Sequence, residues 1–261
     1  PANIRVIEGD TDKVSFGTGT GGSRTASIGT SAVFEAIGKI VDKTLKVAAH
    51  LLEASDTDIE FARGSFTVSG TDKSISFTEV AQSTSQPAKI PDGMEPGLYE
   101  IATFNPEKAN FPNGCHISEV EIDPDTGAVK IVKYTVVDDV GFEINPLLVK
   151  GQVHGGIAQG AGQILMEDLH INSVGQTLAG TFLDYAMPRA DDFCYFNVEG
   201  RPVPTETNPL GAKGAGECGT VGSMPSVMNA IIDAMAPYGV SHIDMPATPE
   251  KIWRAIQEAS N

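Results

Sequence analysis

One glycine-rich segment, Gly211–Gly222, constrains the fold and the chemistry of this chain more than any other feature. It holds a single carboxylate, Glu217, among five glycines, and the apolar run Val227–Met235 follows at once. Glycine lets backbone approach a ligand closely, and a helix start offers unpaired N–H groups to an anion. We expect Ser223 to cap the following helix, with Pro225 in its first turn. A carboxylate held between such elements can lose solvent and act as a proton acceptor near neutral pH.

The same segment also permits a plain interpretation as a flexible connector with a solvated Glu217. Lys213 adds a fixed positive charge, which suits an anionic ligand but does not exclude the connector. Cys218 lies beside the glutamate, yet no histidine is near it in the sequence to activate a thiol. We therefore expect Cys218 to be a small buried residue rather than a nucleophile.

A second glycine-rich loop, Gly17–Arg24, precedes a long apolar-periodic segment. Successive backbone N–H groups there, with Ser23 and Arg24, can form a nest for a phosphate group. The loop is neither a Walker A motif nor a dinucleotide-binding fingerprint, because the required lysine and the distant acid are missing. Taken alone, such a loop before a helix is more often a structural connector than a phosphate site. Two such loops in one chain favour a bulky, phosphate-bearing ligand.

A third segment, Gly151–Gly160, combines glycines with two amide side chains, Gln152 and Gln159. These amides can both donate and accept hydrogen bonds, as the edge of a planar heterocycle requires. The alternative is a helix that packs closely through its glycines, because each glycine costs about 1 kcal/mol relative to alanine in a helix. His154 is expected to be a packed or surface residue, and the five histidines of the chain show no metal-ligand spacing.

The hydrophobic periodicity predicts an α+β fold, with mixed sheets and packed helices. A hairpin is expected at His116–Ile122 and Val129–Val137, because both strands alternate around a turn at Asp123–Gly127. The other expected strands are at 3–8, 59–62 and 65–69, with a second hairpin at 167–185; the expected helices are at 33–54, 77–82, 147–166, 226–236 and 249–258.

Composition and charge exclude several classes of protein. The formal net charge of −16 argues against nucleic acid or an anionic membrane as a partner. No apolar run approaches the length of a membrane span, and no signal peptide is visible. The three cysteines form no C-x-x-C pair, so we expect neither a zinc site nor a disulfide framework, and a cytoplasmic location.

The ordered motifs of the chain resemble those of the molybdenum hydroxylases, the family of xanthine oxidase and aldehyde oxidase. The resemblance extends over nearly the whole chain. Within the family, the chain looks most like the large subunit of the aerobic carbon monoxide dehydrogenase type. The motifs that carry it are Gly9–Asp12, Gly19–Arg24, Val137–Gly141, Asn145-Pro146, Gly151–Gly156, Gln159-Gly160, Asp184–Arg189 and Asn208–Glu217.

The resemblance implies a domain organisation. Residues 1–261 correspond to the C-terminal, cofactor-binding region of a longer molybdenum-binding subunit, and 58–96 is expected to be a peripheral excursion within it. The implied partners are the N-terminal part of that subunit, an iron–sulfur subunit, a flavin (FAD) subunit and a small-molecule substrate, in a complex that dimerises. A fragment made alone is expected to be inactive.

The resemblance also assigns roles to residues. The implied ligand is a molybdopterin that carries molybdenum, in its cytosine dinucleotide form. Glu217 matches the catalytic glutamate, and the implied reaction is hydroxylation of an aldehyde, an N-heterocycle or a similar substrate with oxygen from water. Gln152 is implied to hydrogen-bond the pterin or the molybdenum oxo group. The residues implied to hold the pterin and its phosphates are Thr20, Gly21, Gly22, Ser23, Arg24, Lys213, Gly214, Ala215 and Gly216.

Three alternatives stay open from the sequence. The chain could belong to a carbon monoxide dehydrogenase, although Cys115, Cys194 and Cys218 do not stand in the copper-binding motif of those enzymes. It could be a non-catalytic module for cofactor binding or assembly when isolated. It could also be a hydrolase of a phosphate ligand with Glu217 as base, although no convincing nucleophile or metal set accompanies that residue.

Overall fold

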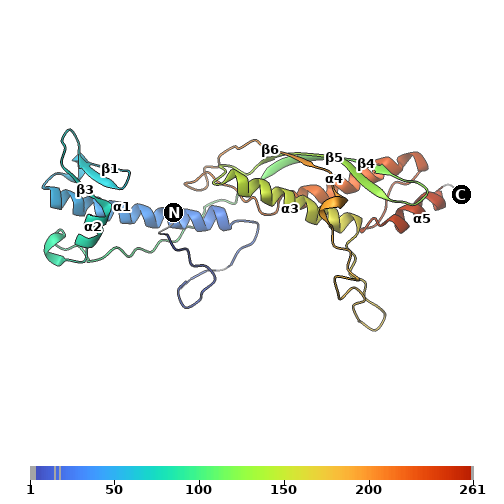
Figure 1. Ribbon diagram of the computed structural model, residues 1–261, viewed down its shortest axis with the longest axis horizontal. Coiled ribbons are helices and arrows are strands. Elements are labelled where there is room, and N and C mark those ends of the chain that lie inside the picture. The colour runs from blue at the N-terminus through green and yellow to red at the C-terminus, as the bar shows by residue number, and fades with distance from the viewer. Residues whose placement is uncertain (1–3, 15, 18, 260–261) are drawn as a thin grey trace. The chain divides into compact units, whose positions relative to one another are not determined.

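The computed structural model describes residues 4–14, 16–17 and 19–259, and the chain divides into two compact units (Figure 1). One unit combines Pro1–Ser27 with Lys108–Asn261, and the other is Ile28–Glu107. Both glycine-rich loops and Gln152 therefore belong to the same unit. In the part of the chain that the structure describes, no helix has both the length and the apolarity that a membrane span needs.

The unit Ile28–Glu107 packs two helices around a small antiparallel sheet. Helix α1 (Thr30–Leu52) and helix α2 (Phe77–Ser83) accompany strands β1 (Ile59–Ala62), β2 (Ser65–Val68) and β3 (Ser74–Ser76), in the order β1-β2-β3. The core is formed by Val47, Phe66 and Val80, all fully buried. Helix α2 begins at a capping box between Ser76 and Glu79, which satisfies two otherwise unpaired N–H groups.

The other unit is built on a three-stranded mixed sheet. Strand β4 (Asn113–Ile122) pairs antiparallel with β5 (Val129–Asp139), and β5 pairs parallel with β6 (Phe196–Gly200). Helices α3 (Pro146–Leu165) and α4 (Cys218–Met235) lie along the sheet, and α5 (Pro249–Ala259) completes the unit (Figure 1). Tyr134 and Val136 of β5 are fully buried beneath Ile157 of α3 and Ile231 of α4 in one apolar cluster. The α+β class and the hairpin at 116–137 are thereby confirmed.

Helices α3 and α4 pack closely against each other where glycines form the contact. A Cβ on Gly156 would lie 2.9 Å from the Cα of Gly219, and one on Gly160 would lie 2.7 Å from the carbonyl oxygen of Thr220. Only residues without side chains permit this approach. Close helix packing is therefore the role of Gly156 and Gly160, whereas a Cβ on Gly155 would meet no atom within 4 Å.

Three expected elements differ in the structure. Residues 4–8 form no strand and are exposed, because no strand among the described residues pairs with them; Asn3 lies outside the described residues. The expected hairpin at 167–185 is reduced to a turn and one bridge between Ile171 and Thr177. Ser223 is not a cap: α4 begins earlier, at Cys218, because packing on α3 outweighs the low helix propensity of its glycines.

Short helical turns connect the main elements. The helix expected at 33–54 begins slightly earlier, at Thr30, and a π-helical turn at Thr25–Gly29 precedes it. The remaining turns are 3-10 helices at Asp56–Asp58, Pro87–Lys89, Ala190–Asp192 and Ala236–Tyr238.

Candidate active site

The two glycine-rich loops meet at Glu217. The Ser23 hydroxyl donates a hydrogen bond of 2.8 Å to Oε2 of Glu217, although 194 positions separate the two residues. A Cβ on Gly214 would lie 2.8 Å from the carbonyl oxygen of Ser23, and one on Gly216 would lie 2.9 Å from its Oγ. The glycines of the second loop thus permit a close approach of its backbone to the first loop, whereas the sequence suggested an approach to a ligand.

The first loop turns sharply at Gly22 and Ser23. Both residues have left-handed backbone, with φ of 64° and 58°, which is uncommon for a serine. Gly21, Gly22 and Arg24 are exposed residues of this turn. Thr20 contacts the hydroxyl of Thr25 at the other end of the turn. Consecutive residues in such a turn can point several N–H groups at one anion.

Glu217 occupies the N-cap position of α4 and is exposed. The desolvation expected of it is therefore absent from the described chain. Gln152 of α3 donates a hydrogen bond of 2.7 Å from Nε2 to the carbonyl oxygen of Gly216, next to the glutamate. The structure thus brings Ser23, Gln152 and Glu217 together from three distant segments of the sequence.

Lys213 anchors the base of the second loop. Its ammonium donates a hydrogen bond of 2.5 Å to Oδ2 of Asp139, at the end of β5. Oδ1 of Asp139 accepts hydrogen bonds of 2.9 Å from the N–H groups of Gly141 and Val203. Burial acts to raise the pKa of Asp139, but these hydrogen bonds and the Lys213 charge outweigh it and lower the pKa below its ordinary value. Lys213 therefore holds the loop in place, and its charge is already compensated.

A cavity of about 410 Å³ adjoins Glu217, and its walls include side chains that the sequence analysis did not single out. His116 and Asp138 line it together with Ser23, Glu217 and Cys218. A polar residue at an inward-facing position of an alternating strand, such as His116 in β4, was the available signal.

Three side chains, Tyr134, His116 and Asp138, form a hydrogen-bonded series. His116 Nδ1 lies 2.7 Å from the hydroxyl of Tyr134, and Nε2 lies 3.3 Å from Oδ1 of Asp138. Burial raises the pKa of Tyr134 above its usual range. The His116 ring packs directly against Gly222, where a Cβ would lie 2.5 Å from Nε2. This hydrogen-bonded series therefore packs against α4 near its N-terminal end, where Glu217 is the N-cap.

Cys218 is unsuited to nucleophilic catalysis. Burial, followed by the nearby negative charge of Asp138, raises the pKa of its thiol to about 12. The thiol donates a hydrogen bond of 3.1 Å to the carbonyl oxygen of Ala215. His154 is likewise a packed residue, against the rings of Tyr195 and Phe196, and burial lowers its pKa. Both assignments agree with the expectations from the sequence.

The residues present fit a large anionic cofactor. The cradle combines exposed loop backbone at Gly21 and Gly22, an amide at Gln152 and a carboxylate at Glu217. A Cβ at Gly214 would push the two loops apart. Such a surface suits phosphate and heterocycle edges together, and a carboxylate beside them can accept a proton.

Comparisons with known proteins agree with this chemistry. The sequence profile of the molybdopterin cofactor-binding domain family matches residues 1–194. The chain is 35% identical over 257 residues to the carbon monoxide dehydrogenase large chain of Hydrogenophaga pseudoflava, and 38% identical to the nicotine 6-hydroxylase large subunit of Paenarthrobacter nicotinovorans. Each match covers 98% of this chain and 32% of the relative, so the chain spans about a third of the length of these curated relatives.

Solved structures give the same result. The crystal structure of Cu,Mo-CO dehydrogenase superposes with a TM-score of 0.87 at 32% identity, over 95% of this chain and 31% of that chain. Quinoline 2-oxidoreductase from Pseudomonas putida 86 superposes with a TM-score of 0.85 at 35% identity, over 93% of this chain and 31% of that chain. The chain therefore belongs to the molybdopterin cofactor-binding domain family, within the molybdenum hydroxylases of the xanthine oxidase type.

Proposed function

We propose that this chain is the C-terminal, cofactor-binding region of a molybdenum hydroxylase large subunit, with Glu217 as the general base. The observation that carries the proposal is the meeting of the two glycine-rich loops at that carboxylate, with Ser23 bonded directly to it. When bound, a molybdenum-carrying pterin supplies two-electron oxidation chemistry with oxygen from water.

The cofactor-binding residues divide between the two loops and α3. Backbone N–H groups of the turn at Thr20–Arg24 hold phosphate, and Gly214–Gly216 lets the second loop lie close to the same ligand. Gln152 bonds the loop through Gly216 and offers its amide edge beside it. Lys213 contributes to the cofactor site indirectly, because its hydrogen bond to Asp139 holds the second loop in place.

Glu217 accepts the proton in the chemical step. Its position at the N-terminus of α4 places the carboxylate where the partial positive charge of the helix end favours a negative group. The Ser23 hydroxyl orients one carboxylate oxygen and leaves the other free to accept a proton. The ring of His116 packs against Gly222 and so helps to hold the N-terminal part of α4, and with it the base, in position.

The finer assignments are also part of this proposal. The cofactor is the cytosine dinucleotide form, and electrons leave through an iron–sulfur subunit and a flavin subunit in a dimeric complex. The N-terminal part of the subunit completes the substrate pocket, and residues 58–96 are peripheral to the chemistry. The substrate is an aldehyde, an N-heterocycle or a similar small molecule with an electrophilic carbon. The three free cysteines suit the reducing cytoplasm.

The substitution Glu217→Gln tests the proposal in the complete enzyme. The amide keeps the size of the side chain but cannot accept the proton, so turnover should fall by a factor on the order of 10²–10⁴. Molybdenum and pterin content should stay at the wild-type level. Glu258→Gln, at an exposed position of α5, is the matched control and should leave both unchanged. Near-normal turnover of Glu217→Gln at full molybdenum loading would refute the assignment of the base.

A further inference from the structure

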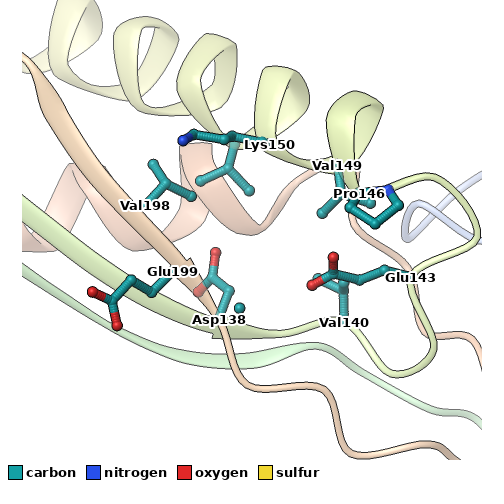
Figure 2. Close-up of a pocket in the computed structure, with 10 residues that line it drawn as sticks. Asp138, Val140, Glu143, Pro146, Val149, Lys150, Val198 and Glu199 are labelled. Atoms are coloured by element: carbon teal, nitrogen blue, oxygen red, sulfur yellow. The ribbon is translucent and has the colours of Figure 1, made fainter.

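A second, smaller cavity lies between the start of α3 and the ends of β5 and β6 (Figure 2). It measures about 160 Å³ and is lined by Asp138, Glu143, Glu199 and Lys150, together with apolar side chains. Three carboxylates and one ammonium thus surround it. This charge balance favours a cation as its occupant.

Asp138 is the buried member of this group, with 5% of its surface exposed. Its Oδ1 lies 3.3 Å from His116, but its Oδ2 is fully buried and has no hydrogen-bond partner among the described residues. Figure 2 shows the carboxylate directed from β5 toward α3. A buried carboxylate oxygen without a partner is costly, so this atom calls for a donor that occupies the cavity.

Glu143 faces Asp138 from the other side of the cavity. Its carboxylate is turned toward Asp138, whereas that of Glu199 is turned away (Figure 2). The Lys150 ammonium extends along α3 and away from both inward-facing carboxylates. The side chains of Glu143, Glu199 and Lys150 form no hydrogen bond or ion pair with other described residues. The carboxylates of Asp138 and Glu143 can therefore accept hydrogen bonds from one cationic ligand in the cavity.

The walls decide which kind of cation fits. Val140, Val149, Val153 and Val198 make most of the lining apolar. A hydrated metal ion gains nothing from such walls, and no three His, Cys, Asp or Glu side chains of the described part converge to hold one. A planar guanidinium or an ammonium on a short alkyl stem matches both the walls and the two carboxylates.

We propose that this cavity binds a guanidinium or primary ammonium group on an alkyl stem, held between Asp138 and Glu143. Two sources carry this chemistry: a free small organic cation, or an arginine or lysine side chain from the rest of the longer subunit. Glu143, Glu199 and Lys150 line this cavity and not the larger one beside Glu217, whereas Asp138 lies between the two cavities and lines both.

The experiment uses the complete subunit in its complex, with n-propylguanidinium and n-propylammonium as probes and calorimetry as the readout. Tetramethylammonium is the control probe, because it has the same charge but no N–H donor. Glu143→Gln and Asp138→Asn remove an inward-facing charge, and Glu199→Gln removes one that is turned away. Thermal unfolding of the same four proteins, the wild type included, detects a resident side chain.

A free-ligand site predicts saturable probe binding that is about tenfold weaker in Glu143→Gln and unchanged in Glu199→Gln. A resident side chain predicts no probe binding, together with a Tm lowered by about 2 °C or more in Glu143→Gln but not in Glu199→Gln. Either pattern supports the proposal. If no probe binds and Glu143→Gln unfolds like Glu199→Gln, the cavity holds only water and the proposal is overturned.

Discussion

Asp139 shows how a single side chain can hold a loop of the site in place. It joins the end of β5 to Lys213 of the second glycine loop and to two backbone N–H groups. Because these contacts favour the charged carboxylate, they lower its pKa. Folding and the position of the loop are thus linked through one ionised group.

Asp139→Asn is expected to lower the free energy of unfolding by about 1–3 kcal/mol at pH 7, because it leaves Lys213 unpaired. The sign of the pH dependence follows from the lowered pKa. The stabilisation is fully present above the unfolded-state value, near 3.8, and is lost as pH falls through the lower folded-state pKa. Denaturant unfolding at a series of pH values should show the two proteins converging below about pH 4. A constant difference down to pH 2 would contradict this role.

The residues of the candidate site were predictable from the sequence to different degrees. Glu217 and the two loops carry local signals, namely a carboxylate among glycines and glycines before a helix. For Tyr134, His116 and Asp138 the only local signal is the inward-facing position of His116 in β4. Their contacts could not be predicted, because these residues meet only when β4 and β5 pair in register. The capture of Lys213 by Asp139 was likewise invisible, since 74 positions separate the two residues.

At the scale of elements, the crossing of α3 and α4 brings Gln152 to the Glu217 loop. Gly156→Ala should disrupt this crossing, because its Cβ would lie 2.8 Å from the backbone nitrogen of Thr220. We expect a loss of about 1–3 kcal/mol in the free energy of unfolding. Gly155→Ala, one residue earlier and with no atom within 4 Å, should be neutral or stabilising by up to about 1 kcal/mol. Equal effects of the two substitutions in denaturant titrations would rule out the packing role.

The elements that periodicity predicted best are the long and strongly patterned ones. Helices α1, α3 and α5 and the β4–β5 hairpin lie where the pattern placed them. The predicted start of α4 was wrong because Gly219 and Gly222 are typical of a loop. In the structure Gly219 contacts α3 and Gly222 contacts His116. Tertiary packing decided there against local propensity.

At the scale of the whole molecule, one segment of the chain exposes an unusual amount of apolar surface. Within residues 169–187, the exposed fractions reach 83% at Phe182 and 93% at Leu183, and Leu169, Val174 and Leu178 are exposed as well. The segment extends away from the helices of its unit (gold in Figure 1). Exposed apolar surface of this kind marks contact with another part of a protein or with a partner.

The chain made alone is therefore expected to self-associate and to bind no pterin stably. Leu183→Asp should raise the dissociation constant of the self-associated form about tenfold, because it removes one apolar side chain from the contact. Gln176→Asp adds the same charge to the same segment without removing apolar surface. This substitution should change the dissociation constant little. Sedimentation velocity at matched concentrations measures both. A monomeric wild-type chain that carries stoichiometric molybdenum would contradict the expectation.

If the two loops that meet at Glu217 form the cofactor site, the turn at Gly22 holds the phosphate of the cofactor, and the molybdenum content of the complete enzyme measures this. Gly22→Asp places a negative side chain against the bound anion, whereas Gly22→Asn has nearly the same shape without the charge. Both must adopt the left-handed backbone of this position, φ 64°, which asparagine and aspartate tolerate better than most residues. We predict that Gly22→Asp abolishes molybdenum loading, and that Gly22→Asn and Arg24→Ala retain part of it because backbone N–H groups carry most of the binding. If Gly22→Asp loads molybdenum like the wild type, the loop is only a connector and the phosphate is held elsewhere.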